Sequence, residues 1–202
     1  MRLGIFGGTF DPVHFGHLVL AEQCLEQCRL DQVWFVPAGV PPHKLAQTIA
    51  PGKARAEMLD LAVAGHDRFR VDRREVNRSG PCYTVETLAE LHSEDPSREL
   101  FFLLGADSLV EFSTWREPGQ IVKLAQLAVV NRGGGTPPDL DMLGRSIGPL
   151  AESRIRIVTI PGIDISSSDI RRRVRESKSI RYMTPRAVEC YIQTHKLYEE
   201  VG

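Results

Sequence analysis

A strand–turn–helix pattern at the amino end constrains the fold of this chain more than any other feature. A short apolar run, Leu3–Phe6, leads directly into a glycine-rich turn that ends in two histidines, and an apolar-periodic segment, Leu18–Cys28, follows. The turn reads Gly7-Gly8-Thr9-Phe10-Asp11-Pro12-Val13-His14-Phe15-Gly16-His17. Glycines let a backbone approach a ligand without a Cβ in the way. The pattern therefore predicts a buried first strand, a ligand-binding turn at its carboxyl end, and a helix.

The two histidines, His14 and His17, are three positions apart and share one face at the predicted start of the helix. Backbone N–H groups at a helix N-terminus attract anions, and imidazoles there can donate hydrogen bonds to phosphate oxygens. Gly16, between them, is expected to leave room for a nucleotide against the helix. The alternative is an ordinary strand–helix turn, but the compact His-x-Gly-His pattern after a first strand favours phosphate binding.

Further apolar runs and helical patterns alternate along the chain. The strand candidates are Leu3–Phe6, Val33–Val36, Phe69–Val71, Leu100–Leu104, Leu127–Val130 and Ile155–Ile160, and the helix candidates are Leu18–Cys28, Lys53–Ala64 and Thr84–His92. Continuous apolar runs are typical of parallel strands buried on both faces. The alternation predicts a Rossmann-like α/β fold, with a doubly wound, mostly parallel sheet and helices on both faces. Ligands of such sheets bind at the carboxyl ends of the strands, near the switch in strand order.

Composition limits the function classes. With 202 residues and a formal net charge of -1, the chain is expected to form one domain, 1–202, with a small helical part from about residue 166. No global charge favours a nucleic-acid partner, and no apolar run approaches the ~20 residues that span a bilayer. The start is too short for a signal peptide, so we expect a cytoplasmic protein. The four cysteines lack zinc-site spacing, which predicts no protein-bound metal.

A second candidate phosphate site begins at Ile165. Ser166 and Asp169 fit the S-x-x-D pattern of a helix start. Ser167, Ser168 and Arg171 then place hydroxyls, free N–H groups and a guanidinium on its first turn. The alternative is a capped helix with a solvated basic face, and the pairing with the first turn favours phosphate binding.

Three weaker segments surround these two. His43 and Lys44 follow two prolines in a loop, which we read as an ordinary surface loop or a mobile element near the site. Tyr83-Thr84 precedes a helix, where Thr84 is either an N-cap or part of a carboxylate site. Asp107 follows a strand, placed to contact a ribose or to cap the next turn. Trp115 can stack on a ring, although packing is its commoner role.

Several common catalytic motifs do not occur in the chain. The sequence contains no Walker A P-loop and no Rossmann G-x-G-x-x-G. Hydride transfer and P-loop ATP hydrolysis are therefore poor interpretations.

Taken together, these segments resemble the bacterial nicotinate-nucleotide adenylyltransferases, within the nucleotidyltransferase superfamily marked by H-x-G-H. The first turn resembles the family's GGTFDPVHxGH signature, and the later segments resemble its VPPHK, SYT, GADSL and ISSTxIR motifs. The closing segment, from Arg181-Tyr182-Met183 to Leu197-Tyr198, resembles its RYxxPxxVxxYIxxxxLY pattern. The departures are Ser168 for threonine, Cys82 for serine and Lys196 for glycine. The likeness covers nearly the whole chain.

This resemblance implies adenylyl transfer from ATP to nicotinate mononucleotide, giving deamido-NAD and pyrophosphate, with Mg²⁺ carried by ATP. It implies catalytic roles for His14, His17 and Arg171. The implied ATP-binding residues are Gly7, Gly8, Thr9, Phe10, His14, Gly16, His17, Ile165, Ser167, Ser168 and Arg171, and the mononucleotide-binding residues are His43, Lys44, Tyr83, Thr84, Asp107 and Trp115. We expect no nucleic-acid or membrane partner, and an oligomer is possible. The alternatives are nicotinamide mononucleotide or phosphopantetheine as acceptor, or a non-catalytic nucleotide-binding module.

Overall fold

The computed structural model describes residues 1–39, 49–132 and 153–199. Its centre is a six-stranded sheet in the order β3-β2-β1-β4-β5-β6, and every neighbouring pair is parallel. The strands are β1 (Arg2–Gly8), β2 (Gln32–Pro37), β3 (Phe69–Val71), β4 (Glu99–Gly105), β5 (Ala125–Arg132) and β6 (Ile155–Ile160). The predicted parallel α/β sheet is confirmed.

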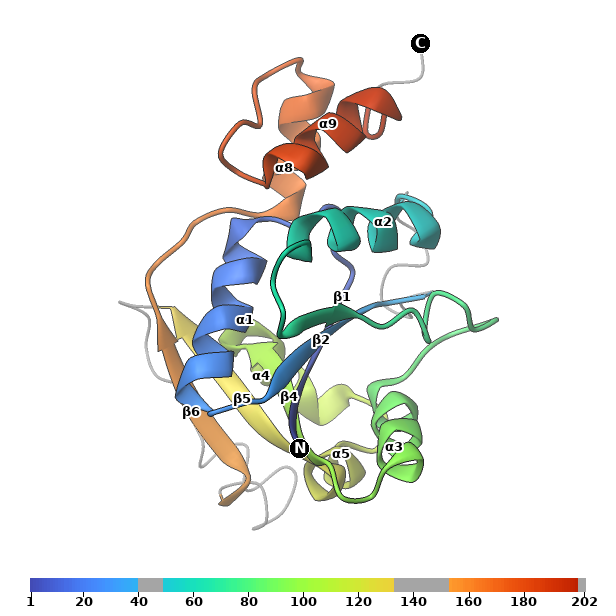
Figure 1. The fold of residues 1–202 in the computed structure, drawn as a ribbon, viewed down its shortest axis with the longest axis vertical. Helices are drawn as coiled ribbons and strands as arrows, with labels where there is room; N and C mark the ends of the chain where they lie inside the picture. The colour runs from blue at the N-terminus through green and yellow to red at the C-terminus, as the bar shows by residue number, and fades with distance from the viewer. Residues whose placement is uncertain (40–48, 133–152, 200–202) are drawn as a thin grey trace.

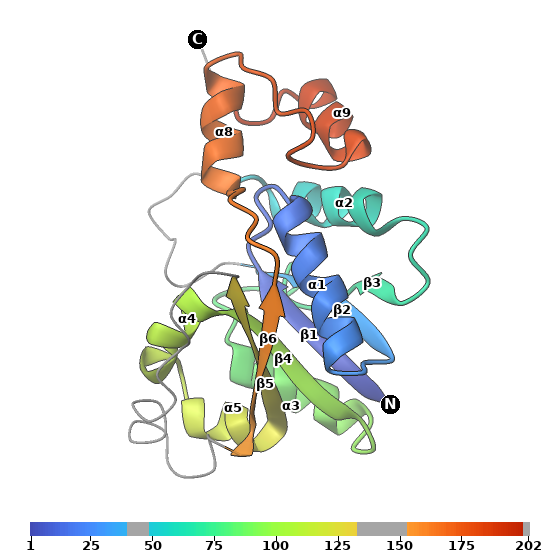
Figure 2. The same cartoon turned by 90° about the vertical axis from the view of Figure 1, so that its left-hand side faces the viewer.

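Helices cover both faces of this sheet (Figures 1 and 2). The described helices are α1 (Phe15–Gln27), α2 (Gly52–Val63), α3 (Thr84–Glu94), α4 (Ala106–Val110), the 3-10 turn η2 (Phe112–Thr114), α5 (Pro118–Leu124), α8 (Ser167–Arg175) and α9 (Arg186–Thr194). One face packs against α1 and α2, and the other packs against α3, α4 and α5. This two-sided cover explains why the central strands β1, β2 and β4 lack polar alternation.

Neighbouring strand residues supply the two separate cores. Leu3 and Ile5 of β1 lie in the core with α3 and α5, whereas Phe6 lies in the core with α1 and α2. On β4, Phe101 and Phe102 divide in the same way. Because successive side chains of a strand point to opposite faces, each apolar run supports both layers at once.

Most predicted elements appear with shifted ends. The strands Phe69–Val71 and Ile155–Ile160 begin and end where predicted, while β1 continues through both glycines to Gly8. The first helix begins at Phe15, three residues earlier than predicted. Polar residues in its first turn hid this start from the apolar pattern.

The carboxyl-terminal helices α8 and α9 lie beyond the carboxyl ends of the strands, next to α1 and α2 (Figures 1 and 2). Ile170 of α8 and Val188 and Ile192 of α9 belong to the same apolar cluster as α1 and α2. The predicted helical part from about residue 166 is therefore packed onto the sheet domain.

Some predictions concern residues outside the described ranges. His43 and Lys44 lie in 40–48, outside these ranges. Within the described ranges, no helix has the length and apolar character required to cross a membrane.

Candidate active site

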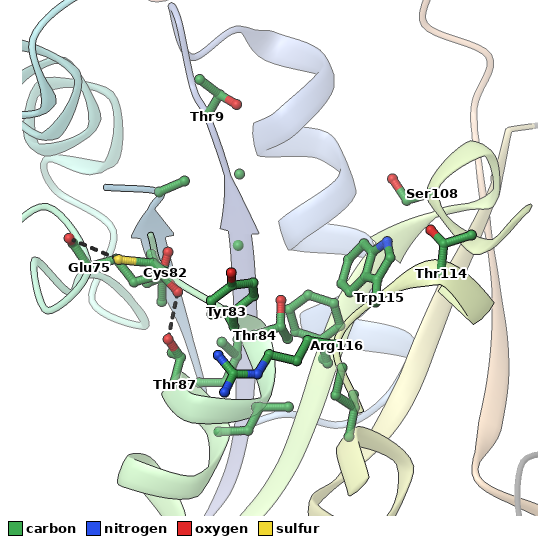
Figure 3. Close-up of a pocket in the computed structure, with 18 residues that line it drawn as sticks. Thr9, Glu75, Cys82, Tyr83, Thr84, Thr87, Ser108, Thr114, Trp115 and Arg116 are labelled. Carbon is green, nitrogen blue, oxygen red and sulfur yellow. Dashed lines mark hydrogen bonds between the residues drawn. The ribbon is translucent and has the colours of Figure 1, made fainter. Parts of the chain in front are cut away.

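The site lies where the strand order reverses. From β1 the chain adds β2 and β3 on one side of the sheet, and β4 pairs with β1 on the other. A cavity of about 540 Å³ opens at the carboxyl ends of these strands (Figure 3). This is the position predicted for a ligand of a doubly wound sheet.

Three predicted segments meet around this cavity. Gly7, Gly8 and Thr9 contribute the end of β1 and its turn, Tyr83 and Thr84 come from the start of α3, and Trp115 follows η2. The other lining residues are Ile5, Val36, Ala38, Glu75, Cys82, Thr87, Leu88, Phe102, Ser108, Thr114, Arg116 and Ile121. Aromatic and aliphatic walls with a few polar groups are typical of small-molecule sites.

Gly8 is required by the packing of the turn. A Cβ at Gly8 would lie 2.9 Å from the ring of Phe10. The Phe10 side chain is itself only 2% exposed and packs among core aromatic rings. Because its side chain is buried, Phe10 can make the predicted contact with ATP only through its backbone atoms.

The two histidines form a stacked pair at the start of α1. Their ring centroids are 3.7 Å apart, and the backbone N–H of His14 donates to the ring Nδ1 of His17 at 3.2 Å. Because Nδ1 accepts this bond, a neutral His17 imidazole carries its proton on Nε2 and offers a donor there. His14 is only 5% exposed, while His17 is partly exposed. His17 is thus the more accessible of the two imidazoles.

Two local predictions about this helix start need refinement. A Cβ at Gly16 would lie 3.0 Å from the His14 ring, so this glycine makes room for the imidazole. The Phe15 N–H donates to the Met183 carbonyl at 3.1 Å and is already used within the protein. This N–H group is therefore not among the free donors of the helix start.

The start of α8 joins the first turn, as the pairing of the two motifs predicted. Ser166 caps the helix by accepting the Asp169 N–H at 3.1 Å. The Ser167 hydroxyl donates to the Pro12 carbonyl at 2.9 Å, and Arg171 donates to the Asp11 carbonyl at 2.7 Å. The predicted helix cap is present, and the start of α8 contacts the first turn.

Arg171 is also fixed from its own helix. Its Nη2 lies 3.3 Å from the Ser168 hydroxyl oxygen, and its Nη1 lies 3.8 Å from Asp11 Oδ2. These contacts use only part of a guanidinium's donors, so others remain for an anionic ligand.

Sequence reasoning missed Arg55, which is 2% exposed on α2. Its guanidinium donates to the carbonyls of Ala50, Thr9, Ala38 and Gly39 at 2.9, 2.8, 2.7 and 3.2 Å. Burial lowers the pKa of this guanidinium from its usual value, and the nearby Asp11 carboxylate opposes that effect. Arg55 thus ties the turn after β1 to the turn after β2, and nothing in the helical pattern distinguishes it from a surface arginine.

The start of α3 forms the opposite wall of the cavity. Tyr83 is the N-cap and Thr84 the first helical residue, so the N-cap prediction for Thr84 is wrong. The Cys82 thiol lies 3.5 Å from the Glu75 carbonyl oxygen, so it hydrogen-bonds at the position where the family motif has serine. The N–H groups of the first helical turn have no partner within the helix and can receive an anion.

Three further residues of this wall were not predicted: Glu75, Thr87 and Arg116. The buried Thr87 hydroxyl donates to Glu75 Oε1 at 2.6 Å, and burial raises the pKa of the Glu75 carboxyl. The Arg116 guanidinium lies 4.5 Å from the centre of the Tyr83 ring, and Figure 3 shows it beside Thr84. Its position next to Trp115 was the one signal available in the sequence.

Trp115 combines the packing role and the lining role. Its ring packs against Phe102 and Phe112 at centroid distances of 5.8 and 5.3 Å, while the residue also lines the cavity.

Asp107 lies on α4, directly after β4. Ile165 packs against the α1–α2 core just before α8.

Comparison with known proteins places this site in a family. Residues 5–173 match the family described as Cytidylyltransferase-like. A probable nicotinate-nucleotide adenylyltransferase of Thermomicrobium roseum is 48% identical over 200 residues, covering 99% of this chain and 92% of that protein. A probable nicotinate-nucleotide adenylyltransferase of Thermus thermophilus is 46% identical over 200 residues, covering 98% and 100%.

The fold also matches solved structures. Plasmodium falciparum nicotinic acid mononucleotide adenylyltransferase complexed with NaAD superposes with a TM-score of 0.81 at 19% identity, covering 98% of this chain and 97% of that one. At this identity the match supports the fold alone, while the sequence relatives decide the family. The chain therefore belongs to the cytidylyltransferase-like family and, within it, to the nicotinate-nucleotide adenylyltransferases, a group of nucleotidyltransferases.

Proposed function

We propose that this site transfers the adenylyl group of ATP to nicotinate mononucleotide and releases pyrophosphate. The observation that carries the proposal is the meeting of the β1 turn, the start of α3 and Trp115 around one cavity. The names of the sequence relatives support the same reaction. The product is deamido-NAD, so the enzyme acts in NAD biosynthesis.

In this reaction a phosphate oxygen of the mononucleotide attacks the α-phosphorus of ATP in line. The new P–O bond forms as the bond from the α-phosphorus to the bridging oxygen breaks, and pyrophosphate leaves with the electron pair. A phosphate is already an adequate nucleophile, so positioning and charge stabilisation carry the catalysis.

The phosphate-binding roles follow from the two helix starts. His14 and His17 face the ATP phosphates, with Nε2 of His17 donating to the α-phosphate. Ser167, Ser168 and Arg171 receive the β- and γ-phosphates at the start of α8, where the first N–H groups add donors. Gly7, Gly8, Thr9, Phe10, Gly16 and Ile165 complete the ATP site through their backbones and through packing.

The acceptor occupies the cavity itself. Trp115 stacks on the pyridine ring, and the first N–H groups of α3, at Thr84 and Val85, receive the nicotinate carboxylate. Arg116 adds positive charge to the same wall, although Glu86 Oε1 lies 2.9 Å from its Nη1 and offsets part of it. A nicotinamide NH₂ group facing these donors would leave them poorly paired. His43 and Lys44 bind the mononucleotide phosphate, and Asp107 binds a ribose.

The remaining aspects of the function are also proposals. Mg²⁺ enters with ATP, held by phosphate oxygens and water, the ligands it prefers. The enzyme is cytoplasmic, uses small-molecule substrates and has no nucleic-acid partner, in keeping with its formal net charge of -1.

The test is pyrophosphate release from ATP and Mg²⁺ with three acceptors in parallel: nicotinate mononucleotide, nicotinamide mononucleotide and phosphopantetheine. We expect strong turnover with the first alone. Equal use of both pyridine nucleotides would keep the reaction and overturn the carboxylate site at α3. ATP binding without release on any acceptor would favour a non-catalytic nucleotide-binding module.

A further inference from the structure

The carboxyl-terminal segment contacts the turn Thr9–His17 through Tyr198. The proposed reaction gives this residue no role. The Tyr198 hydroxyl donates to Asp11 Oδ1 at 2.7 Å across 187 positions of sequence. Asp11 is 4% exposed and lies between the glycines and the histidines of the turn. The contact therefore links the end of the chain to the centre of its first motif.

The Asp11 carboxylate is held from several sides. Besides Tyr198, the Ala50 N–H donates to the same Oδ1 at 3.3 Å. Oδ2 lies 3.8 Å from Nη1 of Arg171, and the same nitrogen donates to the Asp11 carbonyl at 2.7 Å. The positive charge of buried Arg55 also acts on this carboxylate. The two carboxylate oxygens thus have different partners, with neutral donors on Oδ1 and Arg171 near Oδ2.

This division has a consequence for Arg171. A carboxylate whose Oδ1 is fixed by two donors cannot turn freely, so Oδ2 stays directed at the guanidinium. Burial raises the pKa of the Tyr198 hydroxyl above its usual value, so the hydroxyl remains protonated and donates. Without that donor, Asp11 is free to rotate and to pair differently with Arg171.

We propose that Tyr198 is a positioning residue for the phosphate end of ATP, acting through Asp11 to hold the Arg171 guanidinium beside the turn Thr9–His17. The inference rests on the proposed adenylyl transfer, because Arg171 is the group expected to bind the leaving phosphates. Tyr198 itself touches no substrate in this proposal. Its substitution should therefore affect ATP and leave the acceptor unchanged.

The experiment compares Tyr198→Phe with Tyr191→Phe in the full chain. Tyr191 lies on α9, and its hydroxyl donates to Glu57 on α2 at 2.5 Å, so this control removes a hydroxyl from the same region without touching the turn. We would measure kcat, the KM for ATP, the KM for nicotinate mononucleotide and the thermal midpoint. For Tyr198→Phe we expect kcat/KM for ATP to fall about tenfold, the weight of one hydrogen bond to a charged group. The KM for the mononucleotide should stay within about twofold.

The outcomes separate positioning from general stability. A Tyr198→Phe variant with unchanged kcat/KM for ATP, or with equal losses for both substrates, overturns the proposal. If wild type releases no pyrophosphate, the proposed function fails by itself. The Kd of ATP, measured by calorimetric titration, then still compares Tyr198→Phe with Tyr191→Phe.

A second variant keeps the inference testable if Tyr198→Phe does not fold. Asp11→Asn retains an oxygen that accepts the Tyr198 hydroxyl and removes the negative charge that faces Arg171. We expect it to weaken ATP binding with a native circular dichroism spectrum. An unchanged Kd for ATP in Asp11→Asn would overturn the proposal. Where Tyr198→Phe does fold, the double variant adds a second test, because Tyr198→Phe should cost less there than alone when its route through Asp11 is already broken. Independent losses in the double variant would overturn the route through Asp11.

Discussion

The turn Thr9–His17 and the helix α3 form the two ends of the candidate site, and different interactions fasten each of them. The turn is held by donors from distant parts of the chain that bond to its backbone carbonyls. Arg55 reaches it from α2, Ser167 from α8, and the buried Thr184 hydroxyl from the segment before α9 at 2.7 Å. These bonds lie largely inside the protein.

The α3 wall is fastened mainly at the surface. Ion pairs connect arginines of the preceding segment and of the Trp115 loop with glutamates of α3. These pairs join Arg74 to Glu90 and Glu94, Arg78 to Glu86 and Glu90, and Arg116 to Glu86. The glutamates are between 39% and 48% exposed, so water and salt screen them.

The difference follows from what each end has to bind. Phosphoryl transfer depends on donors fixed before the substrate arrives, and buried hydrogen bonds to carbonyls provide that rigidity. In the proposed reaction, the acceptor end presents an aromatic side chain, Trp115, and the start of α3. We therefore expect substitutions at the turn to cost more than substitutions of the α3 ion pairs, and four predictions test this order.

The largest effect is expected from Arg55→Met, which fills a similar volume without donors. It removes four hydrogen bonds from a buried guanidinium to partly buried carbonyls, so we expect a loss of about 3–5 kcal/mol in the free energy of unfolding. Urea unfolding measures this change. The control is Arg73→Met, which removes an exposed arginine paired with Asp60 and should cost less than about 1 kcal/mol. Equal losses in the free energy of unfolding for Arg55→Met and Arg73→Met would contradict the stronger stabilisation expected from buried hydrogen bonds than from surface ion pairs.

Arg55 also shows how far the sequence alone can lead. Apolar runs predicted the six strands within a few residues, and they are clearest in β1, β2 and β4, whose residues are buried on both faces. The motif residues Gly7–Thr9, Tyr83-Thr84 and Trp115 line one cavity, because the carboxyl ends of parallel strands meet at one edge of a sheet. The inward direction of a charged residue on α2 depends on tertiary partners that local sequence does not encode.

The contacts of Asp11 were hidden for the same reason. Its bond to Tyr198 spans nearly the whole chain, and neither residue type indicates the other. Glu75 and Thr87 likewise form a buried pair from a loop and a helix, without spacing that marks a site. Sequence patterns predicted which segments approach the ligand, while the supporting side chains became visible only in the folded structure.

The second prediction separates the acceptor end from the phosphate end by kinetics. Trp115→Ala removes the ring that lines the cavity beside Phe102. We expect the KM for nicotinate mononucleotide to rise about tenfold while the KM for ATP stays within about twofold. Trp115→Phe keeps an aromatic face and should recover most of the loss. An unchanged acceptor KM in the alanine variant would contradict stacking on the pyridine ring.

Unlike the exposed glutamates of α3, Glu75 is a buried carboxyl of the same wall. Its contribution to the free energy of unfolding should therefore depend on pH. Burial raises the pKa of this carboxyl in the folded state above the usual 4.5, so the folded protein binds a proton more tightly than the unfolded chain. The Glu75 contribution to the free energy of unfolding is therefore fully present below the usual pKa. It decreases as the pH rises through the raised pKa of the folded state, and it is lost above that pKa. Glu75→Gln still accepts the Thr87 hydroxyl and avoids this cost.

We accordingly expect Glu75→Gln to gain stability over wild type as pH rises from about 4 to about 8. Urea unfolding across this range measures the difference between the two proteins. Parallel pH profiles would show that the Glu75 carboxyl does not titrate differently on folding.

The smallest effect is expected at the surface of α3, from Glu90→Gln. Glu90 is 48% exposed and pairs with Arg74 and Arg78. Its removal should cost about 0.2–1 kcal/mol in the free energy of unfolding at low salt. The cost should disappear near 1 M NaCl, where the Debye length falls to about 3 Å. The control is Glu26→Gln, which alters an exposed carboxylate on α1 for which no ion pair occurs in the described ranges. If the loss from Glu90→Gln persisted in 1 M salt and exceeded the loss from Arg55→Met, the α3 wall would be the rigid end of the site.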